Sequence, residues 1–271
     1  MVNNELKYLL QKALNIKKRF LQMYHNVNAG HIGSSLSCAE TLTFVKFSCM
    51  KDHDHLILSK GHAAAALYST LCENGELSES DIATFYKNDT YLAAHPPANK
   101  IKGIPFATGS LGHGLSLAAG FGMASKFRND NRKIYCITSD GEINEGSTWE
   151  AAMFINHHQL TNVYWLIDRN CFQGFGTTED VMKLNPLPQK LESFGFTVLE
   201  IDGHNFNDFL TIRKAFIGNK KPVAIICNTH KGKGWRGHEN ALDSHYLPFA
   251  NDEYNTIINF LNAEFALNIS A

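Results

Sequence analysis

The stretch that decides the fold is Ile134-Tyr135-Cys136-Ile137-Thr138-Ser139-Asp140-Gly141, an apolar run that ends in a polar turn. A second apolar run, residues 163–167, ends in the same way with Asp168-Arg169-Asn170. Their β-branched and aromatic residues predict two buried parallel strands, and residues 148–155 between them have a helical pattern. Such a strand–helix–strand unit brings both strand ends to one edge of the sheet, so we expect Asp140 and Asn170 to point into one crevice.

These strand ends carry the oxygen donors that a hard divalent cation prefers. A carboxylate and an amide carbonyl are typical ligands of Mg²⁺, which usually keeps some water and takes further ligands from a phosphate-bearing group. The alternative interpretation of Asp140 is a capping or turn residue, and that of Asn170 is a turn residue. The sequence therefore predicts Asp140 and Asn170 as metal ligands at the edge of a parallel sheet.

The composition argues against a membrane or nucleic-acid-binding protein. The 271 residues are 44% hydrophobic, and the formal net charge of −1 gives no electrostatic footprint for nucleic acid or an anionic membrane. The longest apolar stretches have the length of strands, well below the ~20 residues that span a bilayer. Charged residues interrupt the amino terminus, so we expect no signal peptide, and six cysteines without paired spacing indicate reduced thiols in a cytoplasmic protein.

The order of the elements predicts an α/β fold with a parallel sheet and helices on both faces. We expect strands over residues 55–58, 134–138, 163–167, 197–201 and 223–227, and helices over 5–26, 37–50, 62–75, 79–86, 113–123, 148–155, 207–217 and from 252 onward. Ser37-Cys38-Ala39-Glu40 is interpreted as a capping box that opens the second helix after a loop at 30–37. There is no linker, repeat or low-complexity tract, so residues 1–271 are predicted to form one domain.

Several short motifs resemble the amino-terminal half of transketolases. Asp140-Gly141 and Asn170-Cys171-Phe172-Gln173 resemble a thiamine diphosphate signature. The motifs Gly30-His31-Ile32-Gly33, Ser59-Lys60-Gly61-His62, His95-Pro96 and residues 108–114 occur in the order found in that family. The resemblance covers roughly residues 5–250 and implies a thiamine diphosphate-binding fold.

The resemblance also implies which residues hold the cofactor and its metal. Asp140 and Asn170 would be side-chain ligands of Mg²⁺, and Phe172 would supply a main-chain carbonyl, in a site that Ca²⁺ or Mn²⁺ can also occupy. The implied contacts of thiamine diphosphate are His62, Gly112, His113, Gly114, Gly141, Glu142, Asn170 and His245. Ser139 stands where the family usually has glycine. Because serine is small, we expect the cofactor site to be retained.

Four histidines are predicted to be catalytic, because imidazole titrates in the range that proton transfer to sugar hydroxyls requires. By resemblance, His31 and His95 bind substrate hydroxyls, and His62 contacts both the diphosphate and the substrate. His245 matches a family histidine with the same double contact, and His238 is the competing candidate in that segment. Any one of them alone would more often be a surface or packed histidine, so the prediction depends on their shared order. Residues 229–234 resemble the loop over the cofactor, or else form a basic surface loop.

The implied activity is transfer of a two-carbon ketol unit from a ketose, phosphorylated in our interpretation, to an aldose. This would be a thiamine diphosphate- and Mg²⁺-dependent transketolase of carbohydrate metabolism, such as the pentose phosphate pathway. A full transketolase exceeds twice this length, and its second half binds the aminopyrimidine ring and the sugar phosphate. We therefore expect activity only with a carboxy-terminal partner subunit, in an assembly of two copies of each, with small-molecule sugars as substrates.

Two alternatives stay open at the level of sequence. A related subunit, of deoxyxylulose phosphate synthase or a 2-oxo acid dehydrogenase, would keep the metal motif, although Ser59-Lys60-Gly61-His62 and His95-Pro96 fit transketolase better. A non-catalytic regulatory subunit could retain the fold, but it would need neither Asp140 and Asn170 nor the histidines. A thermal shift on addition of cofactor and Mg²⁺ separates a working cofactor site from a scaffold that has lost it.

Overall fold

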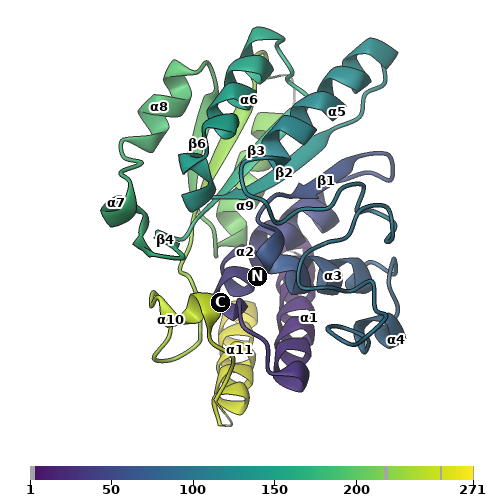
Figure 1. Ribbon diagram of the computed structural model, residues 1–271, viewed down its shortest axis with the longest axis vertical. Coiled ribbons are helices and arrows are strands. Elements are labelled where there is room, and N and C mark those ends of the chain that lie inside the picture. Colours follow the sequence, from purple (N-terminus) through teal and green to yellow (C-terminus); the bar gives the residue numbers. More distant parts are fainter. Residues whose placement is uncertain (1–3, 217–218, 251, 271) are drawn as a thin grey trace.

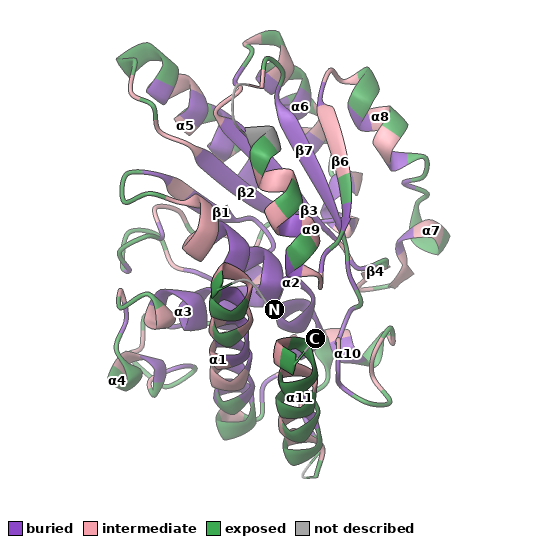
Figure 2. Ribbon diagram, turned by 180° about the vertical axis from the view of Figure 1, so that it is seen from behind, coloured by how far each residue is buried: buried purple, intermediate pink, exposed green. Residues whose placement is uncertain are grey.

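The computed structural model describes residues 4–216, 219–250 and 252–270, and its centre is a five-stranded parallel sheet (Figure 1). The strand order is β1-β2-β3-β7-β6. These strands are β1 (His55–Leu58), β2 (Ile134–Ser139), β3 (Val163–Arg169), β6 (Thr197–Asp202) and β7 (Val223–Asn228). All five predicted strands are present. The central strands β2, β3 and β7 are buried along nearly their whole length, as expected for a parallel sheet covered on both faces (Figure 2).

Alternate residues along the strands face two separate hydrophobic clusters. Tyr135 and Ile137 of β2 point into one cluster, and Ile134 and Cys136 point into the other. The first cluster includes residues of α1 (Asn4–Val27), α2 (Ile32–Phe44), α3 (Ala64–Glu73), α9 (Phe206–Ile212) and α11 (Glu253–Ser270). The second includes residues of α5 (Gly114–Arg128), α6 (Gly146–His157) and α8 (Leu187–Ser193). The predicted α/β fold with helices on both faces is confirmed.

Helix α2 corrects the sequence analysis. The loop expected at residues 30–37 and the capping box at Ser37 are wrong, because the helix already begins at Ile32. Ser37 lies inside the helix, and its hydroxyl donates a hydrogen bond to Oδ2 of Asp168 at 2.6 Å. All 13 residues of α2 are buried. A helix buried all round has no polar face, so it lacks the amphipathic period from which its start could have been predicted.

The shorter elements differ more from the prediction. The helix expected over 79–86 is only the short α4 (Glu79–Ile82), and the one expected over 207–217 ends as α9 followed by the 3₁₀ turn η4 (Arg213–Phe216), with Ile217 outside the described residues. The π-helical turn η1 (Val45–Cys49) forms the end of the helix expected over 37–50, and the 3₁₀ turn η2 (Gly61–Ala63) opens the one expected over 62–75. Elements that we did not predict are η3 (Gly141–Asn144), β4 (Phe172–Gln173), β5 (Gly176–Thr177), α7 (Thr178–Val181), α8 and α10 (Asp243–Tyr246). Within the described ranges, no helix has the length and apolar character needed to cross a bilayer.

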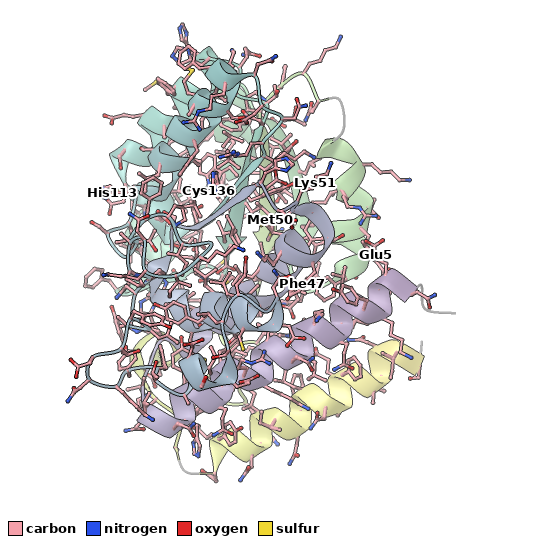
Figure 3. The ribbon with its side chains drawn as sticks, turned by 90° about the vertical axis from the view of Figure 1, so that its right-hand side faces the viewer. Glu5, Phe47, Met50, Lys51, His113 and Cys136 are labelled. Carbon is pink, nitrogen blue, oxygen red and sulfur yellow. The ribbon has the colours of Figure 1, made fainter. Side chains whose placement is uncertain are left out.

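Helices α1 and α11 pack together on one side of the molecule, as Figure 3 shows. In the parallel ladder Ser139 is opposite Asp168, and Arg169 is opposite Asn228. The main-chain N–H of Asp140 continues this ladder by donating to the carbonyl oxygen of Asp168 at 3.1 Å. The chain segments that follow β2, β3 and β7 therefore meet at one edge.

Candidate functional site

Asp140 and Asn170 lie side by side beyond the ends of β2 and β3. The Asp140 carboxylate accepts hydrogen bonds from the main-chain N–H groups of Gly141 at 2.8 Å and Cys171 at 2.7 Å. Oδ1 of Asn170 accepts one from the N–H of Phe172 at 3.1 Å. Cys171 has a left-handed φ of 64°, so the chain folds back over Asp140 at this point. One tight turn thus brings together the three predicted metal ligands.

The Asp140 carboxyl group is an under-neutralised buried charge. It is fully buried, and no ion pair joins it to a described residue. Burial and the nearby Asp168 carboxylate raise the pKa of Asp140 to about 7, against the effect of its two N–H donors. Each carboxylate oxygen accepts one N–H and keeps a further lone pair. These features fit a divalent cation, which would stabilise the charge, and a phosphate or water would have to complete its coordination.

No group of three or more His, Cys, Asp or Glu side chains suited to a metal occurs in the part of the chain that the structure describes. A cation at Asp140 would therefore depend on amide, main-chain and ligand oxygens. That donor set is typical of Mg²⁺ held together with a phosphate-bearing cofactor, rather than of zinc.

Asp168, which the sequence analysis treated only as a strand end, is the centre of a buried network. Its carboxylate pairs with the ammonium group of Lys60, and both side chains are fully buried. It also accepts hydrogen bonds from Ser37 at 2.6 Å, Thr229 at 2.5 Å and the Asn170 amide at 3.0 Å. Burial opposes ionisation, but Lys60 and these donors keep the pKa of Asp168 below its usual value. The network fixes the Asn170 amide so that its carbonyl oxygen faces the Asp140 turn.

Lys231 is a second buried cation that the sequence analysis did not single out. Its side chain belongs to the loop after β7 and is only 1% exposed. Burial and the Lys60 charge lower the pKa of Lys231 to about 8, although Asp140 and Asp168 act in the opposite direction. Unlike Lys60, it has no carboxylate partner within ion-pair distance among the described residues. A buried ammonium group without a partner is suited to an anionic ligand.

Three predicted histidines form a triangle next to Lys231. Ring centroids are 5.8 Å apart for His31 and His62, 5.6 Å for His31 and His245, and 5.6 Å for His62 and His245. Burial, with the positive charge of Lys231 nearby, lowers the pKa of all three, for His245 to about 3. These imidazoles are therefore neutral at pH 7, and each has one ring nitrogen that can accept a hydrogen bond. Nδ1 of His245 is buried and has no hydrogen-bond partner in the described residues, so it is free for a ligand.

The other histidines lie differently. His95 is exposed and lies against Gly109. It is close enough to His31 to contribute to the lowered pKa of that ring. His113, labelled in Figure 3, is the exposed residue at the amino-terminal end of α5 and makes no ring contact with the triangle. His238 pairs with Glu253 at 2.8 Å and stacks on Trp235. Of the two competing candidates, the structure places His245 in the cluster and engages His238 elsewhere.

Glu142 and the glycines beside it make contacts within the protein. The Glu142 carboxylate is fully buried and accepts hydrogen bonds from the Ser59 hydroxyl, from the N–H of Gly112 at 2.8 Å and from the N–H of Ser139 at 3.3 Å. The N–H of Gly114 donates to Ser59 at 3.0 Å, and a Cβ at Gly114 would lie 2.2 Å from the Ser59 oxygen. Glu142 thus ties the loop before α5 to the end of β2. The space beside Gly141 is likewise occupied by the protein, because a Cβ added there would lie 2.9 Å from the Cβ of Gln173.

Ser139 has a local role that glycine could not fill. Its hydroxyl accepts a hydrogen bond from the N–H of Glu142 at 3.3 Å. This bond holds Ser139 against the turn η3, whose amino-terminal cap is Asp140.

Exposed apolar side chains occur beside this cluster and on the segment that follows the Asn170 turn. The Tyr246 ring contacts His245 at 4.4 Å and His31 at 5.9 Å between centroids, and it is 52% exposed. The hairpin and short helix that follow Phe172 expose Phe175 at 86% and Met182 at 61%. Groups of this kind are typical of surfaces that another chain covers.

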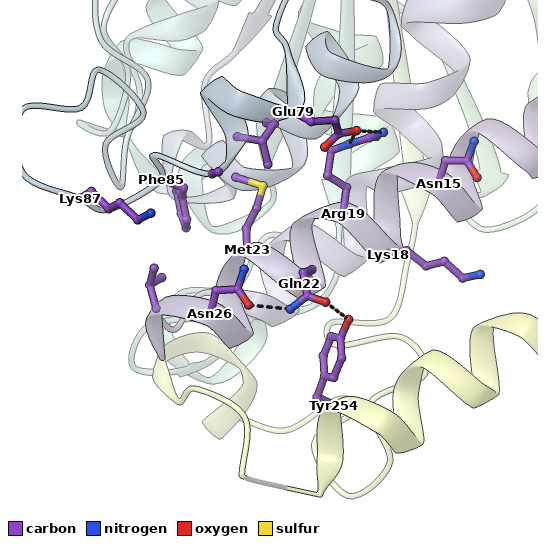
Figure 4. A pocket seen from close by; sticks show the side chains of 13 residues that line it. Asn15, Lys18, Arg19, Gln22, Met23, Asn26, Glu79, Phe85, Lys87 and Tyr254 are labelled. Carbon is purple, nitrogen blue, oxygen red and sulfur yellow. Dashed lines mark hydrogen bonds and ion pairs between the residues drawn. The ribbon is translucent and has the colours of Figure 1, made fainter.

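A hollow of about 730 Å³ lies elsewhere on the molecule, and none of these residues lines it (Figure 4). It lies between α1, α4 and the start of α11. Its walls satisfy each other: Arg19 pairs with Glu79 at 2.8 Å, and Gln22 is bonded to Tyr254 at 2.7 Å. Chemistry, rather than volume, therefore identifies the histidine cluster as the candidate site.

The fold is an α/β domain, and the carboxyl edge of its parallel sheet carries residues suited to a cation and an anionic ligand. The family model described as "Transketolase, thiamine diphosphate binding domain" matches residues 11–266. The chain therefore belongs to the transketolase family and corresponds to its thiamine diphosphate-binding domain. The family, fold and enzyme class predicted from the sequence are confirmed.

Curated relatives include proteins of similar length. The chain is 40% identical over 228 residues to an apulose-4-phosphate transketolase subunit of Phocaeicola vulgatus, covering 80% of this chain and 81% of the relative. It is 35% identical over 266 residues to the 6-deoxy-6-sulfo-D-fructose transketolase subunit SqwG of a Clostridium species, covering 94% and 97%. The crystal structure of transketolase from Campylobacter jejuni matches with a TM-score of 0.83 at 25% identity and covers the whole chain. The present chain spans about half of that protein, 48% of its length.

Proposed function

We propose that this chain is the cofactor-binding subunit of a two-component transketolase that moves a two-carbon ketol unit from a ketose phosphate to an aldose. The observation that carries the proposal is the histidine triangle beside Asp140 and Lys231 at one sheet edge. The names of the relatives, which are subunits of two-component enzymes, support it. Cytoplasmic location and a place in pentose phosphate metabolism stay predictions, and residues 1–271 act in this proposal as one domain.

Asp140, Asn170 and the carbonyl of Phe172 would hold Mg²⁺, and Lys231 would hold the diphosphate of thiamine diphosphate. The under-neutralised Asp140 carboxylate and the unpartnered Lys231 ammonium group support this division, because each lacks the opposite charge that the other ligand brings. When bound, thiamine diphosphate supplies the carbanion chemistry by which a bond next to a carbonyl group is broken and remade. Glu142 and Ser139 would hold the surrounding turns in place.

The histidine triangle would handle the substrate hydroxyl groups. His31, His62 and His245 are neutral at pH 7 because burial and Lys231 lower their pKa values. A neutral imidazole can accept a proton from a sugar hydroxyl and return it, or can hydrogen-bond to the hydroxyl and orient it. The exposed His95 would contact the substrate nearer to the entrance.

A carboxy-terminal partner subunit would cover the exposed apolar rim of the site, formed by Phe175, Met182 and Tyr246. The exposure of these three side chains supports this assignment, because large exposed apolar groups are typical of a surface that another chain covers. We propose an assembly with two copies of each subunit. That partner would mainly determine which sugar substrate is bound. The relatives named above act on a sugar phosphate and on a sugar sulfonate, so an anionic ketose is the substrate class that we propose.

The test is a ketol-transfer assay of the purified chain with thiamine diphosphate and Mg²⁺, with and without the co-expressed partner. We expect no turnover by the chain alone and turnover by the assembly. Substantial activity of the chain alone would contradict the two-component proposal. An assembly that forms and binds the cofactor but transfers no ketol unit from any of several ketose phosphates would instead favour a regulatory subunit.

A further inference from the structure

A chain of polar contacts leads from Glu40 in α2 through His204 to the loop that carries Lys231. Nδ1 of His204 lies 3.2 Å from Oε2 of Glu40, and Nε2 of His204 lies 2.9 Å from the main-chain nitrogen of His230. A main-chain N–H can only donate, so Nε2 of His204 is the acceptor. The proton of the neutral ring is then on Nδ1, where it donates to Glu40. Both ring nitrogens are used, and the tautomer is fixed.

Glu40 is held as a carboxylate. It is 5% exposed and pairs with Lys17, which is 4% exposed. Burial opposes ionisation, but Lys17 and His204 lower the pKa of Glu40 to about 2. An ion pair of this kind gives little net stability, because removing both charges from water costs about as much as their attraction returns. Its position at the start of a contact chain to the site suggests a different use.

This series of polar contacts ends at His230, the residue before Lys231. His230 stacks on His204 with ring centroids 5.9 Å apart and an angle of 5° between the planes. Two further hydrogen bonds fix the loop. The Thr229 hydroxyl donates to Asp168, and the main-chain carbonyl of Lys231 accepts from the N–H of Asn240 at 2.8 Å. The bond to His204 constrains the N–H group between these two contacts, and so the direction in which Lys231 enters the site.

We propose that His204 is a positioning residue of the cofactor site. Glu40 sets its tautomer, its Nε2 holds the N–H of His230, and this contact directs Lys231 toward the bound diphosphate. The inference rests on the proposed function only where it assigns Lys231 to the diphosphate. The effect on the loop itself is independent of that assignment.

Two substitutions of equal charge separate positioning from packing. His204→Gln keeps an oxygen acceptor at the place of Nε2, whereas His204→Asn keeps only a donor at the place of Nδ1, toward Glu40. We expect His204→Asn to speed hydrogen exchange of the His230 amide about fivefold and to weaken binding of thiamine diphosphate with Mg²⁺ to the assembled enzyme about fivefold, which corresponds to one lost hydrogen bond. We expect His204→Gln to restore both values to within about twofold, with the same melting temperature for both variants.

Unchanged exchange of the His230 amide in His204→Asn would overturn the proposal, and so would equal losses in both variants, which would indicate packing alone. The amide measurement needs no cofactor. If the wild-type assembly fails to bind thiamine diphosphate, the proposed function fails, while the exchange of the His230 amide still decides whether His204 holds the loop. Altered exchange with unaltered cofactor affinity would refute the step from His230 to Lys231.

Discussion

Asp140→Asn should stabilise the protein without ligands and abolish its response to them. The raised pKa of Asp140 means that folding favours the protonated form. This stabilisation is complete below the unfolded pKa of about 4 and is lost as the pH rises through about 7. Because its pKa rises from about 4 to about 7, the charged carboxylate at pH 8 destabilises the fold by about 4 kcal/mol relative to a side chain that stays neutral. Asparagine never carries the charge, so it avoids this cost.

The substitution also has a cost of its own. Both carboxylate oxygens accept main-chain N–H groups, from Gly141 and Cys171, and the amide NH₂ of asparagine would have to face one of them. That mismatch costs about 1–3 kcal/mol. We expect a net gain of about 2 kcal/mol at pH 8, a rise in melting temperature of about 4 °C, and almost no difference from the wild type near pH 5.

Addition of the ligands should make the wild type more stable than Asp140→Asn. At a free ligand concentration of about 100 times Kd, thiamine diphosphate with Mg²⁺ adds about 2.7 kcal/mol to the wild type, whereas Asp140→Asn should gain nearly nothing. The assay is thermal unfolding at pH 5 and pH 8, with and without both ligands, and the exposed Asp52→Asn is the matched control that should behave as wild type. The reasoning is refuted if Asp140→Asn is less stable than the wild type at pH 8 without ligands, or if both respond equally to them.

Three further perturbations test other parts of the site. His31→Ala and His95→Ala, assembled with the partner, should keep cofactor affinity within about twofold but lose transfer activity by about 100-fold or more; lost affinity would instead move the residue to the diphosphate end. The clustered histidines have lowered pKa values, so folding favours their neutral forms, and the free energy of unfolding should decrease as the pH falls from 7 to 5. His62→Asn should flatten this pH dependence in denaturant unfolding, and a pH profile identical to that of the wild type would contradict the assignment. Phe175→Ser combined with Met182→Ser should leave the melting temperature of this chain unchanged and weaken its association with the partner at least tenfold in sedimentation experiments; unchanged association would exclude this rim from the interface.

The sheet edge was predictable from sequence because its signals are local. The strands that became β2 and β3 are continuous apolar runs, and a parallel strand–helix–strand unit allows only one relation between their ends. Asp140 and Asn170 could therefore be placed together from the residues alone. The roles of the histidines could not be derived in this way, since each lies on a loop whose path depends on tertiary contacts. Only the resemblance to a family brought His31, His62 and His245 into one hypothesis.

The buried charges were out of reach of sequence reasoning. Lys60 and Asp168 are far apart in the chain, and a lysine after a strand usually reaches solvent. Their pairing depends on the register of β1 and β3 across β2, together with the unpredicted start of α2 that brings Ser37 to the same carboxylate. Lys231 was overlooked for the same reason, because a lysine next to glycine in a basic segment has the pattern of a surface loop. What distinguishes both residues is complete burial, a property of the assembled fold.

The glycines predicted to contact the cofactor have roles within the protein itself. Gly112 and Gly114 are predicted cofactor contacts, and in the structure side chains of the protein fill the space beside each, Glu145 beside Gly112 and Ser59 beside Gly114. The N–H of Gly112 donates to Glu142 and that of Gly114 donates to Ser59. These hydrogen bonds fix the loop without a cofactor or a partner subunit. A loop that is already ordered loses little conformational entropy when a ligand or a second chain arrives. The remaining cost of completing the site then falls on the exposed rim around Tyr246, where the binding energy of a partner subunit would act.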